Sequence, residues 1–571
     1  MGSTSLSASV GSDTRHSSPG SGQRTFSTAR VNTHHPIGTI PRSGMSEEPA
    51  NAAARVVGFG KMPHGDLAQF GAVVGAVGSV LVLLPHRRSL ILGGFAVLAV
   101  AEALLAVALI PRSDLDRLQR PLAVAGLIVV AAFLVAFAFV IVRRPALTPV
   151  VLLLAAPFRI PVDLGTQHAF LLLPLYGVLA ATVLAFCWLA LVSEPRAIPV
   201  FLAGPVAAFI ALTGLSLLWS RDLKQGTIEL VFFLFPFAVL FAVVARAPFP
   251  SWLPRVLWII LVGLTTAFAL IGLFQRATHR LFYAPSLEVD NAFTSYFRVS
   301  SVFRDPSLFG RYLALGTAVI VAAYLLGRVR LAIAGPLLAV IFAALWFSYS
   351  QSSMVTIFVV VTGLALVAGS PGMRRVVAVV SAVIAISAAT VVAVHVQNDT
   401  ARKSTSDRSR LVSVTWRVFR NHPLAGVGVG AQPKASREEA APNLAASRNH
   451  SHTTPLTVAA ELGLIGILAY LAFLAGAGRA LLWVTNRERA VGLGLAAVFA
   501  TLFVHSLFYS GFFEDPITWG SVALAGAALA AYPGRRGAAE GDGTGPSGRV
   551  ATLDASQSDR STPLAADRAE P

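Results

Sequence analysis

The chain has 571 residues, of which 55% are hydrophobic and only 13% are charged. Soluble globular proteins carry about 25% charged residues, so this composition, with a mean hydropathy of +0.68, excludes a soluble enzyme and indicates a polytopic membrane protein. The net charge of +17 would suit nucleic-acid binding, but the basic residues are scattered over short loops and both tails, so no nucleic-acid partner is expected.

Residues 1–65 are rich in Ser, Gly, Thr, His and Arg and show no apolar periodicity. Such a segment cannot bury enough apolar surface to fold, so we expect a disordered tail, cytoplasmic or external. Residues 533–571 are again polar and rich in Gly, and we expect a second disordered tail there.

Between the tails, apolar runs of about 18 or more residues recur, each long enough to cross a ~30 Å hydrocarbon core as a helix. We predict an all-α membrane domain of about 12 to 15 transmembrane helices, with additional N-terminal helices at 66–145 and the main domain at 146–532. The predicted spans are 67–84, 89–110, 121–142, 147–163, 169–192, 198–219, 228–246, 252–274, 306–327, 331–348, 352–369, 376–394, 455–482, 489–510 and 516–532. The run 147–163 is short and broken by prolines, so it suits a dip into the membrane as well as a crossing.

Arginines in short loops orient the domain, because cytoplasmic loops collect Lys and Arg. Five groups fall on one side of the predicted spans: Arg143 with Arg144, Arg328 with Arg330, Arg374 with Arg375, Arg487 with Arg489, and Arg535 with Arg536. That side is expected to be cytoplasmic. The polar segments 275–304 and 395–455 then lie on the external face of the plasma membrane, the larger one with short amphipathic helices.

Arginines also occur where the chain enters the membrane after segment 275–304. Arg298 and Arg304 precede Pro306, which is expected to begin a helix whose N-terminus favours an anion. A planar guanidinium can bind a pair of phosphate oxygens, so a lipid diphosphate would suit this place. The alternative is that these arginines only reach lipid headgroups.

Within the segment 395–455, the sequence predicts an amphipathic helix over about 408–420. Arg410 and Arg417 share its polar face, and apolar residues lie opposite. The following run contains Gly426 and Gly428, which allow the backbone to approach another group closely. A helix that merely orients the loop at the interface is the alternative.

His452 lies just before the apolar run that restarts at Pro455. A neutral imidazole can accept a proton from a sugar hydroxyl, and a placed general base contributes ~10² to 10⁴ in rate. His450 is the rival candidate, and a solvated histidine without a role is the other alternative. Glu461 lies inside the next span, where an ionisable group commonly faces a cavity or a partner; His505 is a weaker candidate for the same reason.

No metal or cofactor is predicted from these residues. Cys187 is the only cysteine and lies in an apolar run, so there is no disulfide framework and no thiolate metal site. The chain contains no His-Glu-x-x-His, phosphate-binding loop or nucleophile-elbow pattern.

Four stretches, in order, resemble the O-antigen ligase and polysaccharide polymerase superfamily, which are lipid-linked glycan transferases of the GT-C type. Residues 298–312 resemble its pattern of Arg, aromatic, Pro-Asn and Tyr-Leu, and residues 350–352 fall where many members have Ser-Arg-Gly. Residues 410–430 resemble its Arg, Trp and Pro-Leu-x-Gly-x-Gly stretch. Residues 452–466 resemble its His-Asn-x-Tyr-Leu followed by Glu-x-Gly-Leu-x-Gly.

The resemblance implies transfer of a glycan from an isoprenoid (undecaprenyl) diphosphate to a glycan or lipid acceptor at the outer face of the membrane, as a polymerase or ligase. Arg298 and Arg410 would neutralise the departing diphosphate, and His452 would accept the proton of the acceptor hydroxyl or orient it. Further candidates for substrate binding are Arg304, Arg417, Glu461, Gly426 and Gly428. The transfer would invert the anomeric centre without a metal. Membrane lipids and a chain-length regulator or another assembly protein are further candidate partners.

Two other functions stay open. A transporter or flippase of lipid-linked solutes predicts polar residues near the bilayer midplane and paired broken helices, of which the sequence shows little. A catalytically inactive relative in envelope assembly is the second, because four positions depart from the family pattern: Ser307, Gln351, Thr453 and Pro455.

Overall fold

A computed structural model describes residues 64–110, 121–164, 167–282, 284–397, 408–439 and 451–533. These residues form an all-α domain with one small β-hairpin among them, and twelve of their helices are long and apolar enough to cross a membrane. The predicted fold class, an all-α polytopic membrane protein, is confirmed. Apart from their inner ends, the two predicted tails lie outside the described residues.

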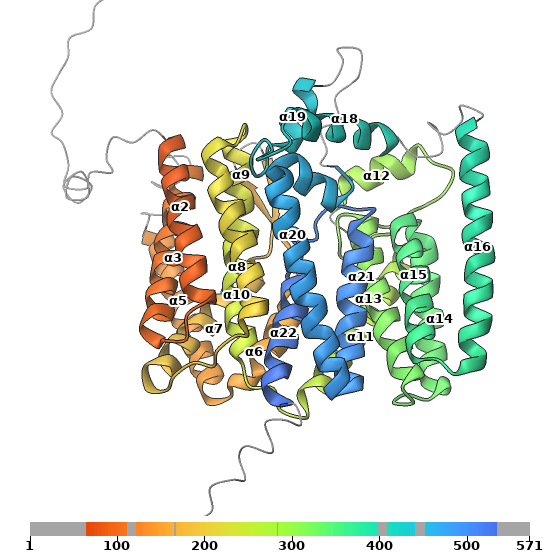
Figure 1. Cartoon of the computed structure of the whole chain (residues 1–571), viewed down its shortest axis with the longest axis horizontal. Coiled ribbons are helices and arrows are strands. Elements are labelled where there is room, and N and C mark those ends of the chain that lie inside the picture. The colour runs from red at the N-terminus through yellow and green to blue at the C-terminus, as the bar shows by residue number, and fades with distance from the viewer. Residues whose placement is uncertain are drawn as a thin grey trace, which may run out of the picture. The chain divides into compact units, whose positions relative to one another are not determined.

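Long helices run side by side between two ends of the domain (Figure 1). They are α2 (His64–Leu83), α3 (Arg88–Leu109), α5 (Pro121–Arg143), α7 (Leu173–Val192), α8 (Val200–Leu215), α9 (Leu223–Glu229) continued by α10 (Phe235–Arg246), α11 (Leu253–Thr278), α13 (Pro306–Leu325), α14 (Leu331–Ser348), α15 (Gln351–Ala368), α16 (Pro371–Gln397), α20 (Thr454–Arg487), α21 (Arg489–Ser506) and α22 (Pro516–Ala531). The shorter helices α12 (Pro285–Ala292), α18 (Arg408–Asn421) and α19 (Gln432–Glu439) gather at one end, which we call the loop end.

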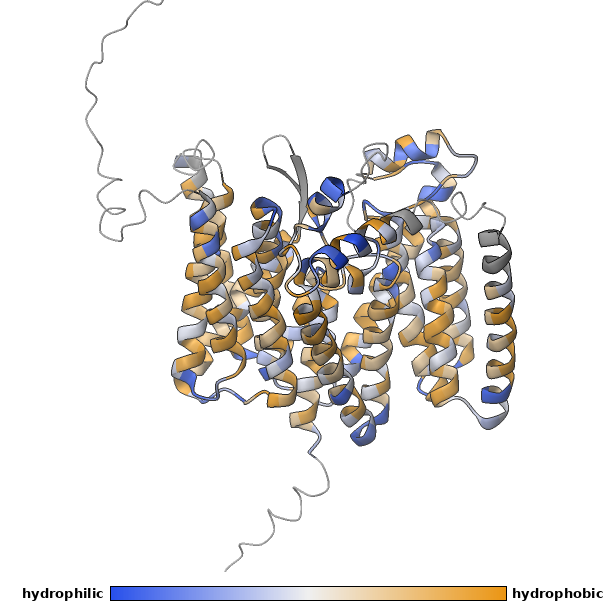
Figure 2. Ribbon diagram, turned by 45° about the horizontal axis from the view of Figure 1, so that its top comes forward, coloured by the Kyte–Doolittle hydropathy of each residue, from blue (hydrophilic) through white to orange (hydrophobic). Residues whose placement is uncertain are grey.

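The bodies of the helices are apolar and the polar residues gather at the two ends (Figure 2). Since α13, α15 and α20 all begin at the loop end, the turns that follow them lie at the opposite end. Those turns carry Arg328, Arg374 and Arg487, so the described arginine groups after residue 300 share one end, as the sequence predicted. Arg535 and Arg536 lie outside the described residues.

The predicted span 147–163 does not form one helix. After a short turn at Pro145–Leu147, α6 covers only Thr148–Ala155, and strand β1 (Ile160–Leu164) then pairs antiparallel with β2 (Gln167–Leu171). Prolines at 157 and 161 remove backbone donors and disfavour helical backbone before them, so the helix ends early. The next span consequently begins at Leu173 and not at 169.

The core is continuous from the N-terminal helices to the C-terminal ones. Ala72 of α2 and Phe95 of α3 belong to the same buried cluster as Phe473 of α20 and Trp519 of α22. Helix α13 is packed between α11, α14, α15 and α21, and most of its residues are buried. The loop-end turns between these helices therefore rest on a rigid base.

Helix α20 is broken near its start, and the break receives the polar segment that precedes it. Gly463 has φ 65° and ψ −158°, which interrupts the helical hydrogen bonds. The 423–428 segment replaces them: Leu464 donates to the carbonyl of Pro423 at 2.7 Å, and Gly428 donates to the carbonyl of Glu461 at 2.8 Å. This exchange fixes α18 and α19 on the membrane domain.

We expect Gly463→Ala to lower the thermal unfolding midpoint, because its backbone region is nearly exclusive to glycine and costs other residues about 1–3 kcal/mol. An added Cβ would also meet the backbone of Leu424. The matched control is Gly478→Ala in the same helix, where a Cβ meets nothing within 4 Å and alanine favours the helix. Equal midpoints for the two variants in detergent would contradict this account of the break.

Candidate active site

Arg311 of α13 lies buried at the loop end, where it joins three other parts of the chain. Its Nε donates to Nδ1 of His505 at 3.3 Å, and its Nη1 pairs with the carboxylate of Asp515 at 3.0 Å. The two terminal nitrogens also donate to the carbonyls of Gly511 and Ser510, each at 3.1 Å. One guanidinium thus connects α13, the end of α21, the turn after it and the start of α22.

Two Asp-Pro steps begin helices and complete this cluster. Asp305 caps α13 by accepting from the backbone N–H two residues later at 2.6 Å, and its other oxygen accepts from the Tyr509 hydroxyl at 2.7 Å. Asp515 caps α22 in the same way at 3.0 Å, and its other oxygen pairs with Arg311. Each carboxylate therefore starts a helix with one oxygen and binds the cluster with the other.

Tyr509 occupies the middle of the cluster. Its ring lies under the Arg311 guanidinium, 5.4 Å from the centroid, and 5.5 Å from the ring of His505. Burial, together with the neighbouring Asp305 carboxylate, raises the pKa of the Tyr509 phenol well above its usual value. The phenol therefore keeps its proton and donates it to Asp305.

His505 is held as a neutral ring by its partners. Nδ1 must be unprotonated because it accepts from the Arg311 Nε–H, so the ring proton is on Nε2. Nε2 faces the hydroxyls of Ser352 and Ser353 on α15, at 3.3 and 3.2 Å. With its lone pair engaged by arginine, His505 is a positioning residue and is poorly placed to accept a substrate proton.

His452 is the second imidazole beside Tyr509, with 6.3 Å between the ring centroids. Its ring is half-buried, and the backbone is held on both sides. The Ser451 N–H donates to Oε1 of Gln432 at 2.9 Å, and the Thr453 hydroxyl donates to the carbonyl of Leu507 at 3.3 Å. These bonds fix the position of His452 at the edge of the Arg311 cluster.

Gln432 at the start of α19 organises the polar segment around His452, and it is 1% exposed. Its Nε2 donates to the hydroxyls of Thr415 on α18 and Ser436 on α19, at 3.1 and 2.8 Å. Its backbone N–H donates to the Glu461 carboxylate at 3.3 Å, while its Oε1 accepts from Ser451. A single amide therefore aligns two helices and the His452 segment.

Arg298 lies at the same end, on the loop between α12 and α13. Asn291 bonds both its backbone N–H and its carbonyl, at 2.9 and 3.0 Å, and its Nε donates to the Ser348 carbonyl at 3.3 Å. The buried Gln275 of α11 holds the next turn through Ser301. Within the described part of the chain, the two terminal nitrogens of the half-buried Arg298 guanidinium make no hydrogen bond to protein, so they remain able to bind a ligand.

The O-antigen ligase family model matches residues 310–471. This region is an O-antigen ligase domain. It begins one residue before Arg311 and includes Gln432, His452 and Glu461. The match supports a ligase- or polymerase-like role in membrane glycan processing, and the many apolar helices indicate a multi-pass membrane protein. No curated protein sequence matches the chain.

The site residues predicted in and before the O-antigen ligase domain fall into two groups. Arg298, Arg304 and His452 all lie at the loop end, the two arginines on the loop before α13, with Arg304 exposed beside Asp305, and His452 just before α20. The Arg410 backbone lies in α18, but its side chain is outside the described residues, as is the whole of His450.

The second group, Gly426, Gly428 and Arg417, makes contacts within the protein. A Cβ on Gly426 would collide with the backbone of Glu461, and one on Gly428 would collide with Ser220, so close contact with protein backbone accounts for both glycines. Arg417 is exposed and donates to the carbonyl of Glu439 at 3.2 Å, which ties α18 to α19.

Glu461 faces a small cavity of about 70 Å³ that Glu229 and Glu514 also line. Its carboxylate accepts from the backbone at Gln432, so it is anchored to the same segment as His452. In the residues that the structure describes, no group of three or more His, Cys, Asp or Glu side chains is arranged to hold a metal ion. The described side chains around Arg311 and His452 offer imidazole, guanidinium, carboxylate, phenol, amide and hydroxyl groups.

Sequence reasoning missed the role of the buried cluster around Arg311. An arginine inside a predicted span is costly and requires a partner, and Asp-Pro before an apolar run occurs both at Asp305 and at Asp515. The arginine inside a span and the two Asp-Pro steps were the sequence features that could have indicated this cluster. Gln432 gave no signal, because a glutamine in a polar segment is usually solvated.

Asp515→Ala is expected to destabilise the domain by about 3–5 kcal/mol, because it leaves the Arg311 charge buried without its carboxylate. The control is Glu194→Ala, which removes a pair with Arg88 whose side chains are 63% and 50% exposed. Exposed pairs contribute about 0–1 kcal/mol. Thermal unfolding in lipid nanodiscs compares the two, and similar midpoints would show that the buried pair does not stabilise the fold.

Proposed function

We propose that the chain transfers a glycan from an undecaprenyl-type isoprenoid diphosphate to a hydroxyl of a glycan or lipid acceptor, at the outer face of the plasma membrane. The observation that carries the proposal is the common location, at the loop end, of His452 in the O-antigen ligase domain and of the Arg298 guanidinium on the loop before that domain. A lipid diphosphate can reach this end with its tail still in the bilayer.

In this proposal, Arg298 binds the diphosphate of the donor. Its two terminal nitrogens can form parallel hydrogen bonds to phosphate oxygens, and its Nε bond to Ser348 fixes the plane of the guanidinium. Charge develops on the diphosphate as it leaves, so a cation already in place stabilises the transition state more than the bound donor. We further propose that Arg304, on the same loop, and Arg410, whose backbone lies in α18, add positive charge, and the mechanism uses no metal ion.

His452 accepts the proton of the attacking hydroxyl. The hydroxyl oxygen forms a bond to the anomeric carbon, the bond from that carbon to the diphosphate oxygen breaks, and the proton passes to the imidazole. Attack opposite the leaving group inverts the anomeric configuration. His505 cannot replace His452, because the Arg311 N–H already occupies its lone pair.

We place the loop end outside the cell because of the distribution of arginines between the two ends of the domain. The described arginine groups after residue 300 lie at or beside the turns of the opposite end, and cytoplasmic loops collect Lys and Arg. The donor site would then face the outside, where finished lipid-linked glycans are displayed.

His452→Ala is expected to lower the transfer rate by ~10² to 10⁴, because it removes the general base. Arg298→Ala is expected to lower it by ~10² to 10³, by analogy with the loss of one electrostatic donor to a transition-state charge. The assay is the formation of glycan product from an undecaprenyl-diphosphate-linked glycan by purified protein in vesicles. Arg280→Ala, an exposed arginine at the loop end, is the control and should keep full activity.

Unchanged product in both site variants would refute the mechanism. A wild-type protein that binds the donor but forms no product would favour the inactive envelope-assembly relative. Movement of the intact donor across the vesicle membrane would favour the flippase.

Gln432→Leu tests whether the buried amide acts by positioning His452. Loss of its bond to the Ser451 N–H frees the segment, and a displacement of about 1 Å at a reacting group can cost on the order of 10²-fold in rate. We expect kcat to fall while the KM for the donor changes little, since Arg298 is untouched. A KM effect without a kcat effect would contradict the positioning role.

A further inference from the structure

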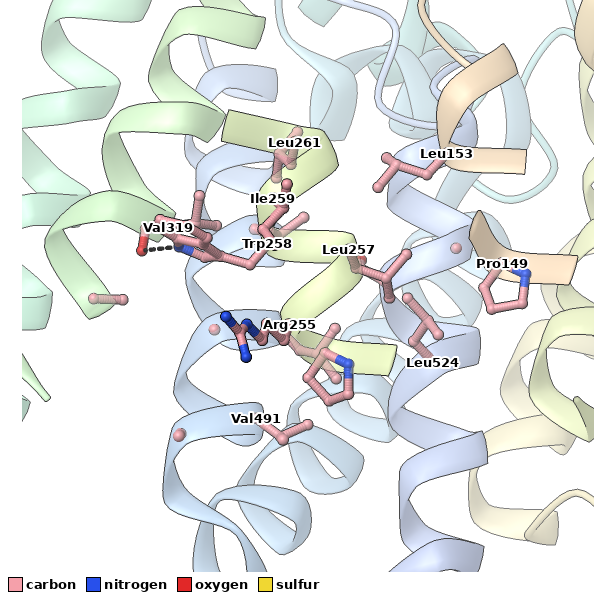
Figure 3. A pocket seen from close by; sticks show the side chains of 18 of the residues that line it. Pro149, Leu153, Arg255, Leu257, Trp258, Ile259, Leu261, Val319, Val491 and Leu524 are labelled. Atoms are coloured by element: carbon pink, nitrogen blue, oxygen red, sulfur yellow. Dashed lines mark hydrogen bonds between the residues drawn. The ribbon is translucent and has the colours of Figure 1, made fainter. Parts of the chain in front are cut away.

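A large cavity lies between α6, α11, α13, α21 and α22 (Figure 3). Its volume is about 890 Å³, at the upper end of the ~300–1,000 Å³ typical of small-molecule sites. We propose that this cavity binds phosphatidylethanolamine, with the acyl chains inside it and the phosphate at Arg255 and Arg328. The proposal does not depend on the transfer reaction.

The wall of the cavity suits acyl chains. Figure 3 shows Leu257, Trp258 and Leu524 around it, from α11 and α22. The only polar atom of Trp258, its indole N–H, already donates to the Val319 carbonyl at 3.2 Å, so it offers nothing to a polar ligand. Ile259 is 51% exposed at the margin, which opens the cavity toward the surrounding lipid.

The charged residues of the cavity lie at the end opposite the loop end. Arg255 is in the first turn of α11, Arg328 is in the turn between α13 and α14, and Glu488 is between α20 and α21. Both arginines are exposed, and neither guanidinium makes a hydrogen bond or ion pair with another described residue. Two guanidiniums suit a phosphate, and one carboxylate suits an ammonium group, the combination that phosphatidylethanolamine carries.

The far end of the cavity reaches the underside of the Arg311 cluster. Pro516 and Ile517, which line it, directly follow Asp515, the partner of Arg311. Acyl chains that fill the cavity would therefore pack against the first turn of α22. Bound lipid should stabilise the turn that carries Tyr509.

Two glycines allow the cavity to be filled by mutation. Gly494 of α21 and Gly520 of α22 line it, and an added Cβ at either meets nothing within 4 Å. Leucine also favours a helix over glycine, so Gly494→Leu with Gly520→Leu should occupy the cavity without weakening either helix. Gly363→Leu, also in open space but outside the cavity, is the matched control.

The experiment adds phosphatidylethanolamine to delipidated protein in detergent and measures bound lipid by native mass spectrometry and the unfolding midpoint by fluorescence. Wild type and Gly363→Leu should bind one lipid and gain in midpoint. The double leucine variant should bind none. Arg255→Ala with Arg328→Ala should lose at least tenfold in apparent affinity, whereas Arg330→Ala, next to Arg328 but outside the cavity, should not.

Three results would overturn the proposal. Equal binding of the lipid by wild type and both double variants would mean adventitious detergent-like association only. Equal binding of phosphatidylethanolamine and phosphatidylglycerol would remove the role of Glu488. Displacement of the lipid by undecaprenyl phosphate would assign the cavity to the isoprenoid chain of the donor. A double leucine variant with an unchanged midpoint before lipid addition shows that its loss of binding is not misfolding.

Discussion

The guanidinium of Arg311 meets the carboxylate of Asp515 inside a membrane domain, with both side chains only 3% exposed. A buried charge is tolerated only when it is paired and its remaining hydrogen-bonding groups are satisfied. Here two backbone carbonyls and the His505 ring accept the remaining hydrogen bonds of the Arg311 guanidinium. Because the partners come from different helices, this electrostatic requirement fixes how the ends of α13, α21 and α22 meet.

His452 and Arg298, the residues proposed to do chemistry, lie around the Arg311–Asp515 pair but do not belong to it. Tyr509 connects the cluster to His452, and the hydroxyls at the start of α15 connect it to the turn that holds Arg298. The polar segment adds a second constraint through Gln432, which accepts from the backbone N–H of Ser451, the residue before His452. The proposed base, His452, and the proposed diphosphate-binding cation, Arg298, are thus positioned by two separate sets of hydrogen bonds.

The sequence could predict the membrane helices and the amphipathic helix α18, because both depend on the periodicity and length of apolar runs. For 147–163 it left a dip or a crossing open because of the prolines, and the structure has a short helix followed by a hairpin in place of one long helix. The sequence predicted that Arg298 and His452 belong to one site only because the motifs that contain them occur in the order found in the O-antigen ligase superfamily. The pairing of Arg311 with Asp515, about two hundred residues apart, leaves no local pattern in the sequence. The glycines at 426 and 428 indicated a close approach of the backbone, but the sequence could not show which segment they approach.

The most direct test of the account is a cryo-electron microscopy structure of the protein with undecaprenyl diphosphate in lipid nanodiscs. The account predicts density for the diphosphate at the loop end, within hydrogen-bonding distance of the terminal nitrogens of Arg298 and on the same side of Tyr509 as His452. A diphosphate bound at the opposite end of the helices, or at the loop end without contact to Arg298, would contradict it.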